Sequence, residues 1–245
     1  MSQLATIDSD LFLFLNGLHV DWMDKFMVLI TDMWAWFPVY LLLIYWTVKQ
    51  YGKRCWWVFL AVGVVVFFSD QLSAHVCKPL FHRLRPCHNV DFQDIIYLPK
   101  GTAAGKYGFV SSHAANTFAV ATFLTPVLRN YRPWPAIALY LWAFISSYSR
   151  IYIGYHYPGD IIAGAILGAL VGMIFWKVFQ KITDKQLKAQ IHSALGRMSY
   201  RAFYRRVYLC APKPRYDMPL IIRTMNPLVE PQPLPYRETR PEWLT

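Results

Sequence analysis

The sequence predicts an all-α membrane protein: a polytopic helical bundle of about five transmembrane helices, with an interfacial helix at the N-terminus. Hydrophobic residues make up 56% of the 245 residues and charged residues only 16%, whereas soluble domains carry about a quarter charged residues. Uncharged apolar runs recur along the chain, for example at 56–69, 134–149 and 161–176. A soluble helical protein with an oversized core is the alternative, but it does not explain so many such runs.

The N-terminal segment, residues 7–19, is too short to cross a hydrocarbon core of about 30 Å. We expect it to lie in the interface as an amphipathic helix. It carries acidic residues before a short apolar run and lacks the basic start of a signal peptide.

Five spans come after it, judged by apolar length, at about 26–48, 55–76, 112–128, 134–152 and 159–180. Asp32 and Pro38 interrupt the first span, so a bent or partly interfacial helix is expected there. In the last span, small residues recur four apart at Gly164, Gly168 and Gly172, a pattern that lets helix backbones approach closely in lipid.

The composition changes after residue 180, which divides the chain into three parts. Residues 1–180 form the membrane-embedded domain, and residues 181–210 are predicted to be a basic amphipathic segment beside the membrane. Residues 211–245 are rich in proline, so we expect an extended or disordered tail.

The positive charge favours a lipid surface over nucleic acid. The net charge is +11, and 13 of the 25 Lys and Arg residues lie from residue 177 onward, against five acidic residues there. No nucleic-acid-binding motif accompanies them, so we expect contact with anionic lipid headgroups and no nucleic-acid partner. Basic connections between the first and second and between the third and fourth spans fall on the same side, which the positive-inside rule assigns to the cytoplasm.

Two clusters of polar residues lie at span ends on the opposite side. Lys78 and Arg85 come after the second span; taken alone, such cations are better explained by snorkelling to headgroups. Ser111, Ser112 and His113 begin the third span, where a capped helix N-terminus favours anions, although an ordinary cap beside a surface histidine fits equally well.

The third cluster lies between the last two spans. Arg150 ends the fourth span, and His156 and Asp160 are spaced so that the carboxylate can orient the imidazole. Alone, such a pair is often only structural. Together, the three clusters supply three cations, a helix dipole and two histidines, which suits a phosphate group attacked by one histidine while the other protonates the departing oxygen. No group of carboxylates suited to divalent metals accompanies them, and the four cysteines lack zinc-site spacing.

These three stretches resemble the signature of the type-2 phosphatidic acid phosphatase family, shared with vanadium haloperoxidases: K-x6-R-P, P-S-G-H and S-R-x5-H-x3-D. The matching residues are Lys78, Arg85, Pro86, Ser111, His113, Ser149, Arg150, His156 and Asp160. The resemblance covers about residues 55–180. The second stretch departs from the pattern, because Val110 replaces the proline and Ser112 replaces the glycine.

The resemblance implies a metal-independent hydrolysis with no cofactor. His156 would attack phosphorus to form a phosphohistidine, Asp160 would fix its tautomer, and His113 would be the general acid. The residues implied to hold the phosphate are Lys78, Arg85, Arg150, Ser111 and Ser112. A serine at position 112 retains a backbone N–H and adds a hydroxyl donor, so activity is expected to be retained.

The implied substrate is a phosphorylated membrane lipid, bound from the bilayer. Undecaprenyl pyrophosphate and lipid A phosphate are level as candidates, with phosphatidylglycerol phosphate and phosphatidic acid after them. The resemblance further implies a multi-pass protein of the bacterial inner (cytoplasmic) membrane, with its active site facing the periplasm and its C-terminus in the cytoplasm. The oligomeric state is left open.

Two other functions are considered. A non-catalytic lipid-binding protein would explain the altered second stretch, but no histidine or arginine of the signature is missing. A haloperoxidase would use the same pocket for vanadate, but the predicted spans oppose it. Cys77 and Cys87 flank the first cluster, where a disulfide is conceivable; free thiols are the preferred interpretation.

Overall fold

The computed structural model describes residues 3–92, 94–103, 105–128 and 134–195, with side chains as far as residue 185. The chain divides into two compact units, Met1–Thr183 and Asp184–Thr245, and the first contains the predicted site residues. The α-helices are α1 (Gln3–Gly17), α2 (Asp21–Ile30), α3 (Phe37–Tyr51), α4 (Cys55–Gln71), α5 (Lys78–Phe81), α6 (Ser112–Leu128), α7 (Trp134–Tyr152) and α8 (Pro158–Leu195). Within the described ranges there is no β-strand, which confirms the all-α fold.

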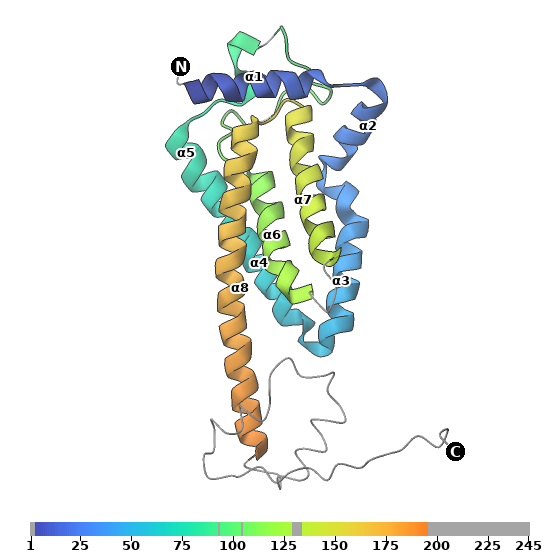
Figure 1. Cartoon of the computed structure of the whole chain (residues 1–245), viewed down its shortest axis with the longest axis vertical. Helices are drawn as coiled ribbons and strands as arrows, with labels where there is room; N and C mark the ends of the chain where they lie inside the picture. Colours follow the sequence, from blue (N-terminus) through green and yellow to red (C-terminus); the bar gives the residue numbers. More distant parts are fainter. Residues whose placement is uncertain (1–2, 93, 104, 129–133, 196–245) are drawn as a thin grey trace, which may run out of the picture. The chain divides into compact units, whose positions relative to one another are not determined.

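Helix α6 lies at the centre of the bundle and packs against α4 and α7 (Figure 1). The core between these helices is apolar and includes Val65 of α4, Phe123 of α6 and Ala143 of α7, none of which is exposed to solvent. Burial of such side chains stabilises the fold by about 1.5–3 kcal/mol for each large one.

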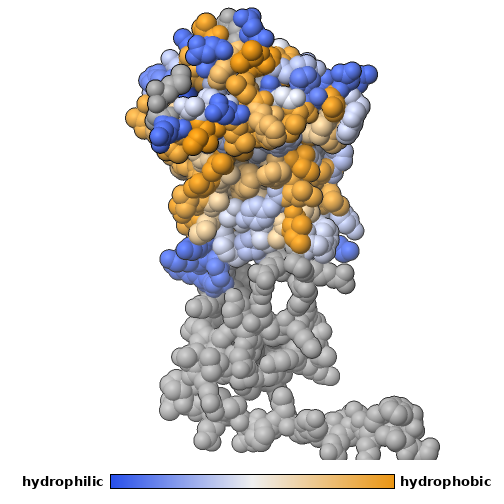
Figure 2. Space-filling model, turned by 45° about the horizontal axis from the view of Figure 1, so that its top comes forward, coloured by the Kyte–Doolittle hydropathy of each residue, from blue (hydrophilic) through white to orange (hydrophobic). Residues whose placement is uncertain are grey.

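Much of the outer surface of the bundle is apolar (Figure 2). Trp56, Leu60, Phe144 and Ile162 are each more than half exposed, and Figure 2 shows such side chains gathered in a band between more hydrophilic ends. A soluble protein rarely exposes so large an apolar surface. By length and composition, Met33–Phe81 and Pro158–Lys185 are suited to cross a membrane. The number of about five transmembrane helices stays a prediction.

The bend expected in the first span is present, and the second span is longer than expected. The first is divided into α2 and α3, with a short 3₁₀ turn, Met33–Trp36, between them; Asp32 precedes this turn and Pro38 lies in the first turn of α3. The second continues from α4 through a π-helical turn, Leu72–Cys77, into α5. Proline is well tolerated in a first turn, which explains why the break falls before Pro38 rather than at it.

At its C-terminal end, α8 continues to Leu195 and so includes part of the expected basic segment at 181–210. The remainder of that segment and the proline-rich tail at 211–245 lie outside the described residues. The division of the chain at residues 180 and 210 therefore stays a prediction.

Helix α1 lies across the end of the bundle formed by α7 and α8 (Figure 1). It buries Phe12 and Asn16 and exposes Leu4, Ile7 and Phe14. This division into two faces agrees with the interfacial helix expected there.

The glycines of α8 allow it to lie directly on α6. A Cβ added at Gly164, Gly168 or Gly172 would come within 2.6, 2.1 and 2.5 Å of the carbonyl oxygens of Ser111, Ala115 and Ala119, respectively. At these three positions, the backbone of α8 lies directly against the backbone of α6. The helix-packing role predicted for these glycines agrees with this close contact.

We predict that Gly168→Val strongly destabilises the protein, because the new side chain must displace the backbone of α6. Overpacking costs about 1–3 kcal/mol or more, and the thermal unfolding temperature in detergent should fall by several degrees. The control is Gly63→Ala in α4, where an added Cβ meets nothing within 4 Å. Equal unfolding temperatures for the two variants would contradict this interpretation.

Candidate active site

The start of α8 fixes the position of Asp160. Tyr157 immediately precedes the helix, and Asp160 is its third residue. The Oδ2 atom of Asp160 accepts a hydrogen bond of 3.1 Å from the backbone N–H of Tyr157, which is the reciprocal half of a capping box. The carboxylate is fully buried.

His156 lies in the turn between α7 and α8 and is 4% exposed. Its backbone N–H donates to the carbonyl of Arg150, the last basic residue of α7. The Nδ1 atom faces Asp160 Oδ2 at 3.4 Å, and Nε2 faces Arg85 Nη1 at 3.5 Å. Donation from Nδ1 to the carboxylate leaves the lone pair of Nε2 free on the side of Arg85.

Arg83 and Arg85 approach this pair from an extended segment. Leu84 between them forms an isolated bridge with Tyr107, and residues two apart in an extended chain share a face. Arg85 therefore reaches His156, while Arg83 Nη1 donates to Asp160 Oδ1 at 2.8 Å.

Gly108 lies directly against the side chains of Asp160, Arg85 and His156. A Cβ at this position would lie 3.0 Å from Asp160 Oδ2 and 3.2 Å from Arg85 Cγ. The loop therefore passes so close that a larger residue would push the carboxylate or the guanidinium out of place.

The start of α6 supplies the second group of site residues. Ser111 is fully buried, and its Oγ accepts from Ala114 N at 3.4 Å, so this hydroxyl caps the helix. Ser112 lines the adjoining cavity, and its Oγ accepts from Lys78 Nζ at 2.9 Å. Thus the structure brings Ser112 and Lys78 together, while the Ser111 side chain faces its own helix.

His113 is held between two helices. Its Nδ1 accepts from Arg150 Nη2 at 3.0 Å, and its Nε2 lies 2.7 Å from Ser146 Oγ. This pattern assigns the proton to Nε2 in the ligand-free arrangement. Arg150 and Ser146 both belong to α7, so α7 orients the histidine of α6.

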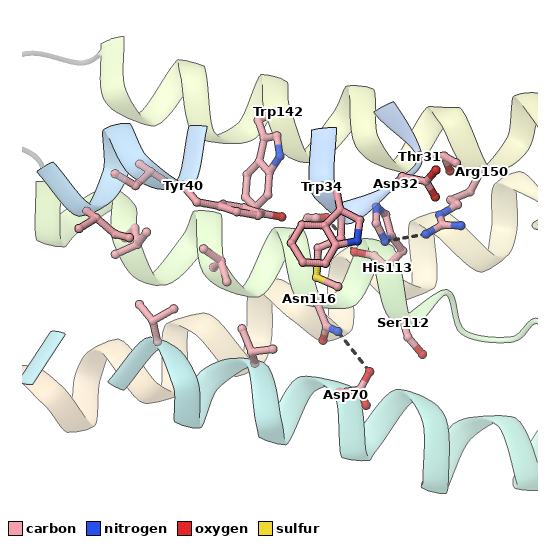
Figure 3. Close-up of a pocket in the computed structure, with 18 of the residues that line it drawn as sticks. Thr31, Asp32, Trp34, Tyr40, Asp70, Ser112, His113, Asn116, Trp142 and Arg150 are labelled. Atoms are coloured by element: carbon pink, nitrogen blue, oxygen red, sulfur yellow. Dashed lines mark hydrogen bonds between the residues drawn. The ribbon is translucent and has the colours of Figure 1, made fainter. Parts of the chain in front are cut away.

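A cavity of about 1130 Å³ joins these groups to the apolar interior. At one end it is lined by site residues, as Figure 3 shows for Ser112, His113 and Arg150. At the other end it is lined by apolar side chains of α3, α4, α6 and α7. These include Tyr40, Leu43, Ile44, Val58, Val62, Leu124 and Trp142.

Further polar residues line this cavity, among them Asp32, which lies beside Arg150 at the site end (Figure 3). Asn116 Nδ2 donates to Asp70 Oδ1 at 3.2 Å, as drawn in Figure 3, and Asp32 and Trp34 lie on the α2–α3 side. Asp32 also forms an ion pair with Lys100 of the loop between α5 and α6. We call Asp32, Asp70 and Asn116 the polar collar.

Electrostatics in the turn between α7 and α8 favour a neutral imidazole at His156. Burial lowers the pKa of His156 to about 4, and the hydrogen bond to Asp160 offsets this only in part. Burial also lowers the pKa of Arg85, whose guanidinium nevertheless stays charged. At neutral pH, an uncharged imidazole therefore stands beside a fixed cation.

Of the predicted site residues, six line one cavity: Lys78, Arg85, Ser112, His113, Arg150 and His156. Asp160 stands directly behind His156, and Ser111 caps α6. Among the described residues, no three His, Cys, Asp or Glu side chains are grouped so as to hold a metal ion. Cys77 and Cys87 are free thiols, as preferred from the sequence.

The sequence interpretation missed Arg83, Ser146 and the polar collar. For Arg83 a signal existed, since it stands two residues before Arg85 and shares its face. Asp70 and Asn116 carried the signal of polar residues within apolar helices, which favours a functional role. Nothing in the sequence pairs Ser146 with His113.

Sequence and structure relate this chain to known proteins. Residues 54–184 match the sequence model of the PAP2 superfamily. The lipid A 4'-phosphatase of Bacteroides thetaiotaomicron is 39% identical over 67% of this chain and 73% of its own length, and that of Porphyromonas gingivalis is 36% identical over 67% and 69%. An undecaprenyl-diphosphatase of Sulfolobus acidocaldarius is 30% identical over 64% and 71%.

The fold also resembles a solved structure. The crystal structure of a transmembrane PAP2-type phosphatidylglycerolphosphate phosphatase from Bacillus subtilis matches with a TM-score of 0.55 and 22% identity, over 74% of this chain and 89% of that one. This likeness supports the membrane-embedded helical bundle.

We predict that acid destabilises the protein through His156. Because the folded pKa lies near 4 and the ordinary value is 6.5, the unfolded chain binds more protons between these values, so stability falls as the pH is lowered through that window. The full loss from this group is about 3 kcal/mol. His156→Gln cannot titrate and should lose less thermal stability between pH 7.5 and pH 4.5 than the wild type; an equal loss would contradict the prediction.

Proposed function

Because the chain belongs to the PAP2 superfamily and is a membrane lipid phosphatase, we propose that it removes phosphate from a cell-envelope lipid through a phosphohistidine at His156. The observation that carries this proposal is the position of His156 and His113 beside Lys78, Arg85 and Arg150, at one end of a largely apolar cavity. A phosphate among these cations has its lipid portion directed into the bundle.

In the first step, Nε2 of His156 attacks phosphorus and the bond from phosphorus to the lipid oxygen breaks. The imidazole becomes positively charged as the P–N bond forms, and the Asp160 carboxylate at 3.4 Å stabilises that charge. Arg85, 3.5 Å from Nε2, is placed to hold a phosphate oxygen at the point of attack.

The departing oxygen takes its proton from His113. In the ligand-free arrangement Arg150 donates to Nδ1 of His113, which opposes protonation of the ring. A bound phosphate competes for the Arg150 guanidinium, which releases Nδ1 to take up a proton. In the second step His113 accepts a proton from water, the water oxygen attacks phosphorus, and inorganic phosphate leaves as the P–N bond breaks.

The phosphate itself is held by charge and by the start of α6. Lys78 and the Ser112 hydroxyl already contact each other at 2.9 Å, so both can turn to a phosphate oxygen without a large movement. The positive end of the α6 dipole adds to them.

We place lipid A phosphates first among the candidate substrates. The relatives from Bacteroides thetaiotaomicron and Porphyromonas gingivalis carry that activity in their names. The polar collar lines the same cavity as the proposed phosphate-binding residues, and it offers carboxylate and amide acceptors. An acylated amino sugar supplies hydroxyl and amide donors there, whereas a prenyl chain supplies none. Undecaprenyl pyrophosphate is the second candidate, supported by the archaeal relative.

The proposed location is the bacterial inner membrane, with the site at the periplasmic face and the C-terminus in the cytoplasm. The support is the distribution of basic residues along the sequence, with 13 of the 25 from residue 177 onward. We propose residues 1–180 as the catalytic domain.

We predict that His156→Ala abolishes phosphate release and that His113→Ala lowers it by about 10²–10⁴-fold, as expected for the loss of a general acid. Protein incubated with ³²P-labelled lipid and denatured in alkali should keep a label that is released by acid, and His156→Ala should not. Full turnover by His156→Ala would contradict the mechanism. Binding of phospholipid by the wild type without turnover on any tested lipid would favour a non-catalytic protein.

We predict that Asp70→Ala lowers kcat/KM roughly tenfold more on lipid A than on undecaprenyl pyrophosphate, because only the former loses a hydrogen bond to a charged acceptor. Initial rates on these two lipids, phosphatidylglycerol phosphate and phosphatidic acid measure this selectivity. A loss common to all four lipids would instead reflect the influence of Asp70 on Lys78.

A further inference from the structure

We infer that Arg83 and Asp8 are positioning residues for the catalytic pair, so that the interfacial helix α1 sets the geometry of His156 through Arg83 and Asp160. Neither residue belongs to the family signature. The inference rests on the proposed role of His156 as nucleophile, and it extends the site to an element outside the three motifs.

The Asp160 carboxylate requires a charged partner of its own. Its side chain is fully buried, and a buried carboxylate is costly unless it is paired and hydrogen-bonded. Arg83 Nη1 contacts Oδ1 at 2.8 Å, which is shorter than the 3.4 Å between Oδ2 and His156. The shortest hydrogen bond of the Asp160 carboxylate is therefore with Arg83.

Arg83 is itself held in place by α1. Its Nη2 donates to Asp8 Oδ2 at 2.6 Å, and its guanidinium lies 4.0 Å from the centre of the Tyr157 ring. The planar guanidinium thus bridges two carboxylates in a fixed geometry. Loss of either carboxylate contact would leave it free to tilt.

Asp8 also contacts α8 directly. Asp8 Oδ1 accepts from the backbone N–H of Gly159 at 2.7 Å, and a Cβ at Gly159 would approach Asp8 Oδ2 to 2.7 Å. The same carboxylate therefore contacts Arg83 and the first turn of the helix that carries Asp160.

Helix α1 is fixed at a second point, near the end of α7. Asn16 Nδ2 donates to the carbonyl of Tyr152 at 2.8 Å, and Phe12 packs between Phe92 and Tyr157. The turn that carries His156 runs from the end of α7 to the start of α8. Helix α1 thus holds both ends of this turn, at Asn16 and at Asp8.

The charged and titratable groups around His156 and Asp160 allow the positioning role of Arg83 to be measured. Asp160 and Arg85 contact His156 directly, and Arg150 and His113 act on it through space. Removal of Arg83 leaves the Asp160 carboxylate uncompensated, so it holds a proton on His156 more tightly. The acid limb of the pH profile should then move to higher pH, which a merely structural loss would not cause.

The experiment compares Arg83→Ala, Arg83→Lys and Asp8→Asn with the wild type, using phosphate release from one lipid substrate between pH 4 and pH 8. We expect kcat to fall roughly 10–100-fold in Arg83→Ala, the range seen when an outer partner of a histidine is removed. We expect KM to stay within about twofold, because the three phosphate-binding cations are retained. The midpoint of the acid limb in the pH profile of kcat/KM should move to higher pH by roughly one unit.

Arg83→Lys should restore part of kcat, because it returns the charge without the second contact to Asp8. Asp8→Asn should lower kcat less than Arg83→Ala, and the double variant should lose no more than Arg83→Ala alone, since both act through one bridge. The matched controls are Asp10→Asn on α1 and Lys106→Ala on the nearby loop, both exposed, and both should match the wild type.

The outcomes separate this inference from the proposed function. The positioning role is overturned if Arg83→Ala and Asp8→Asn keep the wild-type kcat and an unshifted acid limb. The proposed function still stands in that case if His156→Ala is inactive in the same assay. An active His156→Ala would refute the function itself. If Arg83→Ala fails to fold, Asp8→Asn and Arg83→Lys replace it, provided that their unfolding temperatures equal that of the wild type. Their kcat values and the position of the acid limb then decide the question.

Discussion

A fully buried carboxylate organises the site of this protein. Asp160 accepts from the backbone of Tyr157, from Arg83 and from His156, at 3.1, 2.8 and 3.4 Å. Each partner comes from a different structural source: the helix cap, the extended loop and the turn. Because a charge without partners costs several kcal/mol at such a position, these three segments can adopt few other arrangements. The constraint that orients His156 also determines how the loop at Arg83 meets α8.

The close contact of α6 and α8 completes this arrangement. The backbone N–H of Ser111 donates to the carbonyl of Asp160 at 3.1 Å, and Gly164 lies against the carbonyl of Ser111. The start of α6, and with it His113, is therefore held directly against the start of α8. Glycines that the sequence presents as ordinary membrane helix packing thus also hold the helix start that carries His113 against the start of α8.

The sequence was most informative where the relevant contacts are local. The His156–Asp160 pair is four residues apart, and the spacing alone predicts its contact. The Arg83–Asp8 pair is separated by 75 residues, and the Lys78–Ser112 contact by 34. Only the fold brings the members of these two pairs together; the family signature indicated the second pair, and nothing indicated the first. The break at Asp32 was expected as a bend; that it places Asp32 beside the cavity depends on how α2 and α3 pack.

Ser112 shows how the departure from the family pattern is accommodated. The family glycine allows a close backbone approach to phosphate, and a serine places a hydroxyl in that space. Here the hydroxyl accepts from Lys78 and from Ser73, both at 2.9 Å, so it draws the ammonium group toward the start of α6 when no phosphate is bound. In the proposed mechanism, a phosphate oxygen, which is a stronger acceptor than a neutral hydroxyl, displaces Ser112 as the partner of Lys78. The hydroxyl then turns from acceptor to donor toward the same phosphate. Under this proposal, the serine keeps Lys78 in position beside the start of α6.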